Sequence, residues 1–245
     1  MPEEAMYTAP LFSDRADAGE QLAQALIPLV SRLHATGIDA TPIVYALPRG
    51  GIPVAAPVAQ ALDCPLDIVV AKKIATVSNP ELAIGAVTSS GVVLWSGQRR
   101  WPNKNAQWRE ILLAQAQEKA QAQLAQLQPG CPKTNPTGAL ALLVDDGIAT
   151  GMTIAAATEA VKAHNPAQVW ICTPVAPGGL IRWLSQWCDR MVILQTPEPF
   201  LSVSRFYLNF PQVKTQEALS YLQQHNYKHN YITISESSVN ASLEH

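Results

Sequence analysis

Three features that would each define a broad class of protein are missing from this sequence. No apolar run in the 245 residues reaches the roughly 18 that a membrane-spanning helix needs. The formal net charge of −2 lacks the strongly basic balance that is typical of nucleic-acid-binding domains. The N-terminal MPEEAMYTAP has no basic-then-apolar pattern of a secretion signal. We therefore expect a cytoplasmic protein that enters no membrane and binds no nucleic acid.

The cysteine and histidine patterns indicate no metal site, disulfide framework or catalytic triad. No two of the four cysteines form a C-x-x-C pair, so the spacing indicates neither a structural zinc site nor a disulfide framework. We expect free thiols at Cys64, Cys131, Cys172 and Cys188. No G-x-S-x-G motif is present, and His34 and His164 are typical of surface or capping positions. These absences disfavour a serine-type hydrolase.

The composition allows one sizeable domain. Hydrophobic residues make up 48% of the chain and charged residues only 15%. We expect residues 1–225 to form a single domain and 226–242 to be a polar tail. We expect residues 243–245 to be the start of an expression tag rather than part of the fold.

Hydrophobic periodicity predicts alternating helices and strands. Asp17 and Glu20 stand at capping-box spacing before four leucines at helical spacing, which predicts a helix over 17–34 that Pro28 kinks or ends. Further helices are predicted over 52–62, 105–127, 152–163, 178–187 and 215–225. Strands are predicted over 43–47, 66–71, 139–144, 168–173 and 190–194, with a hairpin over 83–95. This alternation predicts an α/β fold: an open, mainly parallel sheet with helices on both faces, a small hairpin and a C-terminal appendage.

The segment LLVDDGIATGMT, residues 142–153, is the strongest functional signal. A buried strand leads directly into Asp145 and Asp146, and an Ala-rich helix follows. Ligands of open parallel sheets bind at the carboxyl ends of the strands, and the first turn of a helix suits a phosphate. Gly151 would let the backbone approach that phosphate closely, and Thr150 and Thr153 would add hydroxyl donors. The two carboxylates would instead accept hydrogen bonds from a neighbouring diol. A capped turn without a ligand uses the same residue types.

This segment resembles the phosphoribosyl diphosphate motif of type I phosphoribosyltransferases. That motif is a hydrophobic strand, two acids and Thr-Gly-x-Thr. The resemblance implies that Asp145 and Asp146 bind the ribose hydroxyls. It implies that the backbone that follows wraps the 5-phosphate, and the residues concerned are Gly147, Ile148, Ala149, Thr150, Gly151, Met152 and Thr153.

A second loop extends the resemblance. Pro48-Arg49-Gly50-Gly51 follows the first predicted strand, where family members have a diphosphate-binding loop. Glycines allow backbone N–H groups to point at an anion, and arginine adds a fixed charge. In the family the peptide before the basic residue is often cis, which here is Pro48–Arg49. Lys72 and Lys73 end the next strand, where a basic side chain would face the diphosphate or be solvated.

The resemblance narrows to a bacterial subfamily described only as predicted phosphoribosyltransferases. Residues 79–87 and 200–210 support it, whereas 96–135 match poorly. Residues 78–98 lie where the family has a mobile covering loop, which implies a water-excluding lid. Ala149 stands where the 6-oxopurine branch has an aspartate, so a hypoxanthine or guanine enzyme of that mechanism is not expected.

The implied reaction transfers the 5-phosphoribosyl group from phosphoribosyl diphosphate to a nitrogenous base or amine and releases diphosphate. Mg²⁺ would be the cofactor, held mainly through substrate oxygens. Two alternatives stay open: a non-enzymatic module that senses phosphoribosyl diphosphate or a nucleotide, and a ribose-phosphate hydrolase. The acceptor base and the oligomeric state, with a homodimer as one option, are not readable. Candidate base contacts are Phe12, Arg15, Phe206 and Tyr207, which core packing would equally explain.

Overall fold

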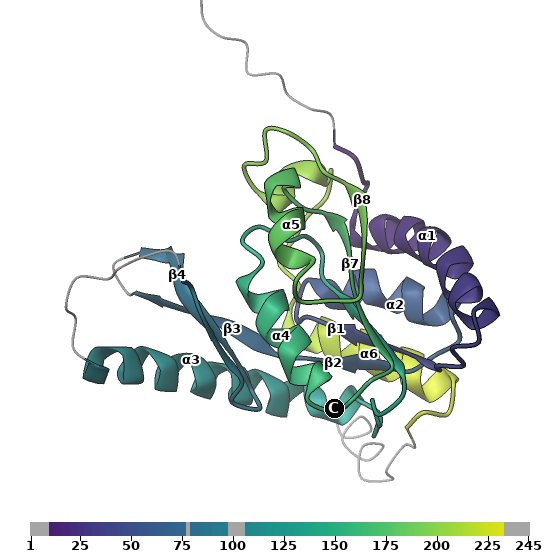
Figure 1. Cartoon of the computed structure of the whole chain (residues 1–245), viewed down its shortest axis with the longest axis horizontal. Coiled ribbons are helices and arrows are strands. Elements are labelled where there is room, and N and C mark those ends of the chain that lie inside the picture. The colour runs from purple at the N-terminus through teal and green to yellow at the C-terminus, as the bar shows by residue number, and fades with distance from the viewer. Residues whose placement is uncertain (1–9, 77–78, 98–105, 233–245) are drawn as a thin grey trace, which may run out of the picture.

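The computed structural model describes residues 10–76, 79–97 and 106–232. A parallel five-stranded sheet in the order β2-β1-β6-β7-β8 forms its centre (Figure 1). Its strands are β1 (Pro42–Ala46), β2 (Leu66–Ile68), β6 (Leu140–Val144), β7 (Gln168–Val175) and β8 (Arg190–Gln195). The predicted α/β class is confirmed. The carboxyl ends of these strands lie along one edge, where parallel sheets bind ligands.

Helices cover both faces of this sheet. On one face, α1 (Arg15–Ala35), α2 (Gly51–Ala61) and α6 (Thr215–Lys228) pack against the strands. On the other face lie α4 (Met152–Lys162) and the short α5 (Ile181–Leu184). All five residues of β6 are fully buried, because this central strand is covered from both sides. Three short 3₁₀ helices connect the elements: η1 (Gln128–Gly130), η2 (Gly178–Leu180) and η3 (Val203–Phe206).

A second, antiparallel sheet projects away from the first (Figure 1). It contains β3 (Ala71–Thr76), β4 (Asn79–Thr88) and β5 (Val93–Trp95), and α3 (Ala106–Leu127) packs along it. We call these four elements the arm. The hairpin predicted over 83–95 is part of it. The predicted strand over 66–71 is wrong as a single element, because β2 ends at Ile68 and β3 begins a new sheet at Ala71. The described part of the expected lid, residues 79–97, lies in β4, β5 and the turns beside them.

Helix ends differ from the prediction in instructive ways. Asp14, rather than Asp17, caps α1: its carboxylate accepts the N–H groups of Ala16 and Asp17 at 2.9 and 3.0 Å. Asp17 instead accepts the N–H of Ser13 at 2.7 Å. The helix does not end at Pro28, which lies inside it. The helix predicted over 178–187 is reduced to η2 and the four residues of α5.

The tail predicted to begin at residue 226 begins later. Helix α6 continues to Lys228, and the side chain of Asn226 is fully buried. Its amide accepts the N–H of Leu66 at 3.2 Å and donates to the carbonyl oxygens of Leu66 and Gly130, both at 2.8 Å. One side chain therefore satisfies backbone groups of β2 and η1, which no local pattern predicts. Residues 233–245, including the expected tag, lie outside the described residues.

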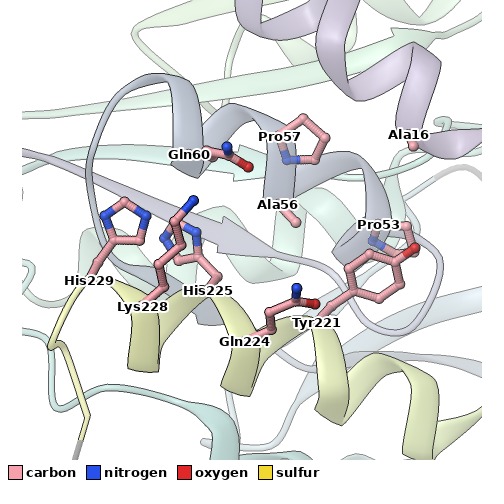
Figure 2. Close-up of a pocket in the computed structure, with 10 residues that line it drawn as sticks. All are labelled: Ala16, Pro53, Ala56, Pro57, Gln60, Tyr221, Gln224, His225, Lys228 and His229. Atoms are coloured by element: carbon pink, nitrogen blue, oxygen red, sulfur yellow. The ribbon is translucent and has the colours of Figure 1, made fainter.

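A hollow between α2 and α6 is lined by His225, Lys228 and His229 (Figure 2). Its imidazoles hold the turn after α2: His225 Nε2 lies 2.9 Å from the carbonyl oxygen of Cys64, and His229 Nδ1 lies 2.8 Å from Asp63. The four cysteines are unpaired. Within the described ranges, no helix is long and apolar enough to cross a membrane.

Candidate functional site

The two predicted acids follow β6 at the carboxyl edge of the central sheet. Asp145 Oδ1 accepts the N–H of Asp146 at 2.9 Å, which orients the first carboxylate. Two hydroxyl groups hold the backbone of the pair. Thr173 donates to the carbonyl oxygen of Asp145 at 3.3 Å, and Tyr207 donates to that of Asp146 at 2.6 Å. We call residues 145–151 the acid loop.

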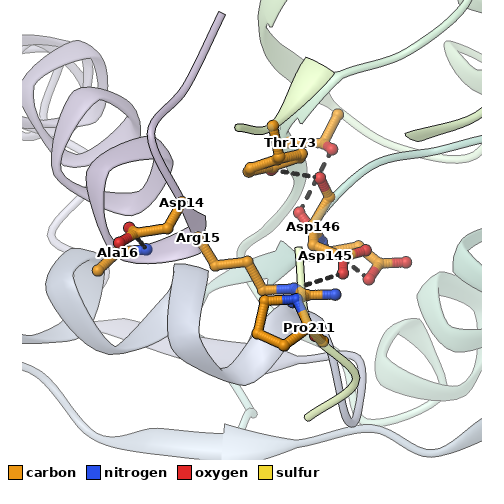
Figure 3. Close-up of polar contacts among 8 residues, drawn as sticks. Asp14, Arg15, Ala16, Asp145, Asp146, Thr173 and Pro211 are labelled. Atoms are coloured by element: carbon orange, nitrogen blue, oxygen red, sulfur yellow. Dashed lines mark hydrogen bonds and ion pairs between the residues drawn. The ribbon is translucent and has the colours of Figure 1, made fainter. Parts of the chain in front are cut away.

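Arg15 of α1 binds the second acid (Figure 3). Its Nε lies 2.8 Å from Asp146 Oδ2, and its Nη1 donates to the carbonyl oxygen of Pro211 at 2.7 Å. The guanidinium also lies over the ring of Phe210, 3.6 Å from its centroid. The side chains of the pair are only 10% and 15% exposed. Arg15 is therefore held in place by three contacts and fixes one oxygen of Asp146.

Two carboxylate oxygens of the acid loop stay available. Apart from the contact between the two carboxyls themselves, no described residue directs a hydrogen bond at Asp145 Oδ2 or at Asp146 Oδ1. Burial raises the pKa of both carboxyls. The charge of Asp146 raises the pKa of Asp145 further, whereas Arg15 opposes the rise at Asp146. A pair of hydroxyl donors from a ligand would offset the desolvation of these oxygens.

The rest of the acid loop leads into the first turn of α4. Ile148 is buried and its N–H donates to the carbonyl oxygen of Val175 at 2.9 Å, whereas Ala149 and Thr150 are exposed. Thr153 is half-buried. The side chain of Met152 packs against Ala86 of the arm, so only its backbone remains for an anion. Ala149 and Thr150 thus form an exposed loop directly before α4, whose N-terminal N–H groups are of the kind that suits an anion.

The glycines of the acid loop have packing roles. A Cβ on Gly147 would lie 2.4 Å from Val203 of η3. Gly151 has φ +78°, and a Cβ there would lie 2.7 Å from the ring of Trp183 in α5. The side on which a Cβ would stand therefore faces α5, whereas the expectation was that it would face a phosphate. The positive φ is the second reason for glycine at this position.

Residues 48–51, which we call the basic loop, touch the acid loop. The Pro48–Arg49 peptide is cis, as the resemblance predicts. A Cβ on Gly50 would lie 2.0 Å from Asp146 Oδ2, and one on Gly51 would lie 2.7 Å from the carbonyl oxygen of Val144. Any larger residue would push the two loops apart. The two glycines therefore allow the predicted ribose and diphosphate loops to form one site.

Basic side chains gather beyond the basic loop. Arg49 Nη1 donates to Thr215 Oγ1 at 3.0 Å, at the start of α6. Burial lowers the pKa of Lys72, and the charges of Arg49 and of Lys119 in α3 lower it further. Lys119 was not predicted from the sequence, because one lysine in an Ala- and Gln-rich helix has no motif around it. The neighbourhood of Arg49, Lys72 and Lys119 favours a multiply charged anion.

The second predicted lysine lies on the other face of the arm. Neighbouring residues of a strand point to opposite faces. Ala86, the partner of Lys73 in β4, packs against Met152 and Ala156 of α4. Lys73 therefore belongs to the α4 face, and the structure brings only Lys72 to the side of Arg49.

The aromatic residues suggested as base contacts belong to the core. Phe12, Phe206 and Tyr207 are 2%, 1% and 4% exposed and pack together. Arg15 is held by Asp146, Pro211 and Phe210. The core explanation, left open by the sequence, is the correct one for these four residues. Arg15 and Tyr207 contact Asp146 of the acid loop, and Phe12 and Phe206 pack with Tyr207.

Residues 14–207 match the model of the phosphoribosyl transferase domain family. The chain belongs to this family. The match spans the acid loop, the basic loop and all four elements of the arm.

Known proteins similar to this chain in sequence and in structure support the family assignment. "Putative phosphoribosyl transferase Rv0571c" of Mycobacterium tuberculosis (strain ATCC 25618 / H37Rv) is 36% identical over 213 residues, which are 86% of this chain and 46% of that protein. The chain thus spans about half the length of the curated relatives it matches. The crystal structure of TT1426 from Thermus thermophilus superposes with a TM-score of 0.70 at 31% identity, covering 87% of this chain and 98% of that one.

Proposed function

We propose that the protein is a phosphoribosyltransferase, which transfers the 5-phosphoribosyl group of phosphoribosyl diphosphate to a nitrogenous base and releases diphosphate. One observation supports this most directly. The acid loop and the basic loop meet at Gly50 and Asp146, so an acceptor for hydroxyls lies between two places suited to phosphate. The donor substrate has the same order of groups, with a ribose diol between a 5-phosphate and a diphosphate.

Each part of the site has a separate task in this proposal. The free oxygens of Asp145 and Asp146 accept the ribose 2- and 3-hydroxyls. The exposed residues Ala149 and Thr150, with the N-terminus of α4, bind the 5-phosphate. Arg49 and Lys72 bind the diphosphate. The acids would repel a phosphate if they pointed at it, and in this assignment they point at the ribose hydroxyls instead.

In this reaction the protein mainly stabilises the charges of the transition state. The bond from the anomeric carbon to the diphosphate oxygen breaks as the bond to the base nitrogen forms, through an oxocarbenium-like transition state. Negative charge develops on the departing diphosphate, where Arg49 and Lys72 stabilise it. Asp145 and Asp146 hold the ribose by its hydroxyls, so that the anomeric carbon keeps its orientation.

The donor set fits a magnesium ion bound largely through substrate oxygens. Across the described ranges, no group of three or more acidic, histidine or cysteine side chains is arranged to hold a metal. Asp145 and Asp146 offer hard oxygen ligands, which Mg²⁺ prefers, and the remaining ligands would be phosphate oxygens and water. Such an ion would neutralise charge on the leaving diphosphate.

A turnover assay tests the proposal. Phosphoribosyl diphosphate and Mg²⁺ are supplied with a panel of free bases and amines, and diphosphate release is measured. We expect base-dependent release with the wild type and none with Asp145→Asn/Asp146→Asn. Binding of phosphoribosyl diphosphate without release for any base would favour the sensing module instead. Release that is independent of added base would favour the hydrolase.

A further inference from the structure

A separate cavity lies between the central sheet and the arm. Its volume is about 420 Å³. Its walls include Tyr45 of β1, Asp67 of β2, Ser89 in the turn between β4 and β5, Thr134 and His164. None of these residues belongs to the acid loop or the basic loop. The lining combines several hydroxyl groups with one carboxylate and with apolar surface from α3 and α4.

Among the described residues, Asp67 is the only carboxylate on the wall of this cavity. Its Oδ2 accepts the hydroxyl of Thr134 at 2.6 Å, and its Oδ1 accepts the N–H of Ile68 at 2.8 Å. Thr134 Oγ1 is in turn 3.3 Å from the hydroxyl of Tyr45. Tyr45 lies opposite Asp67 in the pairing of β1 with β2. A carboxylate has about four lone-pair positions, so each oxygen keeps acceptor capacity.

The charge of Asp67 is uncompensated within the part of the chain that the structure describes. All of its hydrogen-bond partners there are neutral groups, and no ion pair is formed with it. Burial raises the pKa of Asp67, and the hydrogen bonds from Thr134, Ile68 and the neutral thiol of Cys131 only partly oppose this. A partly buried acid without a cation is costly, and a cationic ligand would remove that cost.

The other walls indicate the shape of such a ligand. Leu124 of α3 and Ala160 and Val161 of α4 present apolar surface to the cavity, and the ring of Tyr45 lies on the strand beside Asp67. A flat apolar body could lie among these side chains while its charged end reaches the carboxylate. Thr88, Ser89 and Ser90 line the remaining space.

We propose that this cavity is a second binding site, for a small planar cation of the amidine or aromatic amine class that directs N–H donors at Asp67. The site is distinct from the phosphoribosyl site. The 5-phosphate position lies at the N-terminus of α4, whereas Ala160, Val161 and His164 lie at its other end. Eleven helical residues span about 16 Å, so one small ligand cannot occupy both places.

Calorimetric titration with benzamidine tests the proposal. Benzoate is the control ligand, because it has the same shape and the opposite charge. We expect saturable 1:1 binding of benzamidine to the wild type and none of benzoate. Asp67→Asn, which keeps an acceptor for Thr134, should weaken benzamidine at least tenfold. Glu159→Gln, which removes an exposed acid on α4 outside the cavity, should leave it unchanged.

The opposite results would overturn the proposal. These are no saturable binding of benzamidine, equal binding by wild type and Asp67→Asn, or competition by ribose 5-phosphate, which would place the ligand at the acid loop. If Asp67→Asn fails to fold, Ala160→Leu decides, since it fills the cavity without touching the acid. A tenfold loss supports the site, and unchanged affinity refutes it. The result is independent of transferase activity.

Discussion

The guanidinium of Arg15 lies 2.8 Å from a carboxylate oxygen of Asp146, although 131 positions separate the two residues in the sequence. This contact links the first helix to the acid loop and, through the carbonyl oxygen of Pro211, to the segment before α6. The contact also gives the two oxygens of the Asp146 carboxylate different roles. Oδ2 is held by the protein, and Oδ1 remains for a ligand. The acid loop is therefore positioned by α1 before any substrate arrives.

Replacing Arg15 with Gln should destabilise the fold. The change leaves Asp146 buried without its cation, which costs about 3–5 kcal/mol when a buried pair loses one partner. Chemical denaturation measures the loss in the free energy of unfolding. Adding Asp146→Asn should restore part of the loss, because the double variant has no uncompensated charge. Purely additive effects of the two changes would contradict a direct interaction.

Asp145→Asn/Asp146→Asn should nearly abolish binding of phosphoribosyl diphosphate while the protein stays folded. Two charge-assisted hydrogen bonds to the ribose hydroxyls are lost, worth about 3–6 kcal/mol together. Isothermal calorimetry gives the affinity and circular dichroism the fold. Glu159→Gln on the exposed face of α4 serves as a charge control. Wild-type affinity in the double variant would remove the ribose assignment.

Arg49→Ala should weaken diphosphate binding more than ribose 5-phosphate binding. Arg49 lies on the basic loop near Lys72 and Lys119, whereas the 5-phosphate is assigned to the acid loop and α4. Titration with each anion separately makes the comparison. Lys72→Gln should have the same selectivity, and Lys73→Gln should not, since Lys73 lies on the α4 face. Equal losses for both anions in Arg49→Ala would refute the division between the loops.

The pH dependence of stability should contain a contribution from His225. Burial lowers its pKa, so the folded protein binds this proton less readily than the unfolded chain does. The stabilisation is fully present above the unfolded pKa of about 6.5 and is lost as the pH falls through the folded value. Urea unfolding between about pH 7.5 and 5 measures the slope. His225→Gln should flatten this slope, and an unchanged slope would contradict the assignment to His225.

The sequence predicted those parts of the molecule that depend on neighbours in the chain. The unit from β6 to α4 is local, so periodicity predicts the strand, the helix and the acids between them. The basic loop and its cis peptide follow from the resemblance. Lys119 and the Arg15–Asp146 pair depend on tertiary packing, and no spacing in the chain brings those side chains together.

Helix ends and glycines show the same limit. Asp14 rather than Asp17 caps α1, since both acids precede the leucines and only the backbone geometry selects one. Asn226 reads as part of a polar tail, yet its amide is buried against β2 and η1. Gly151 reads as a phosphate-loop glycine, and its neighbour Trp183 lies 32 positions later in the chain.

Gly151 is the position where the structure changes the expected outcome of a substitution. Its φ of +78° costs an alanine roughly 1–2 kcal/mol. The new Cβ would also meet the ring of Trp183 at 2.7 Å and Leu184 at 3.1 Å, so α5 must shift. Gly151→Ala should therefore lower the melting temperature by several degrees. Because the Cβ points at α5, the backbone N–H groups at the start of α4 should keep their positions.

Thermal unfolding with and without ribose 5-phosphate separates stability from binding at this glycine. A bound ligand raises the melting temperature according to its saturation, so Gly151→Ala should keep the wild-type ligand-induced shift from a lower starting point. Adding Trp183→Leu to Gly151→Ala should relieve the contact with the ring but not the strain at positive φ, so the recovery should be partial. A normal melting temperature with the ligand shift abolished would mean that the new Cβ meets the phosphate rather than α5.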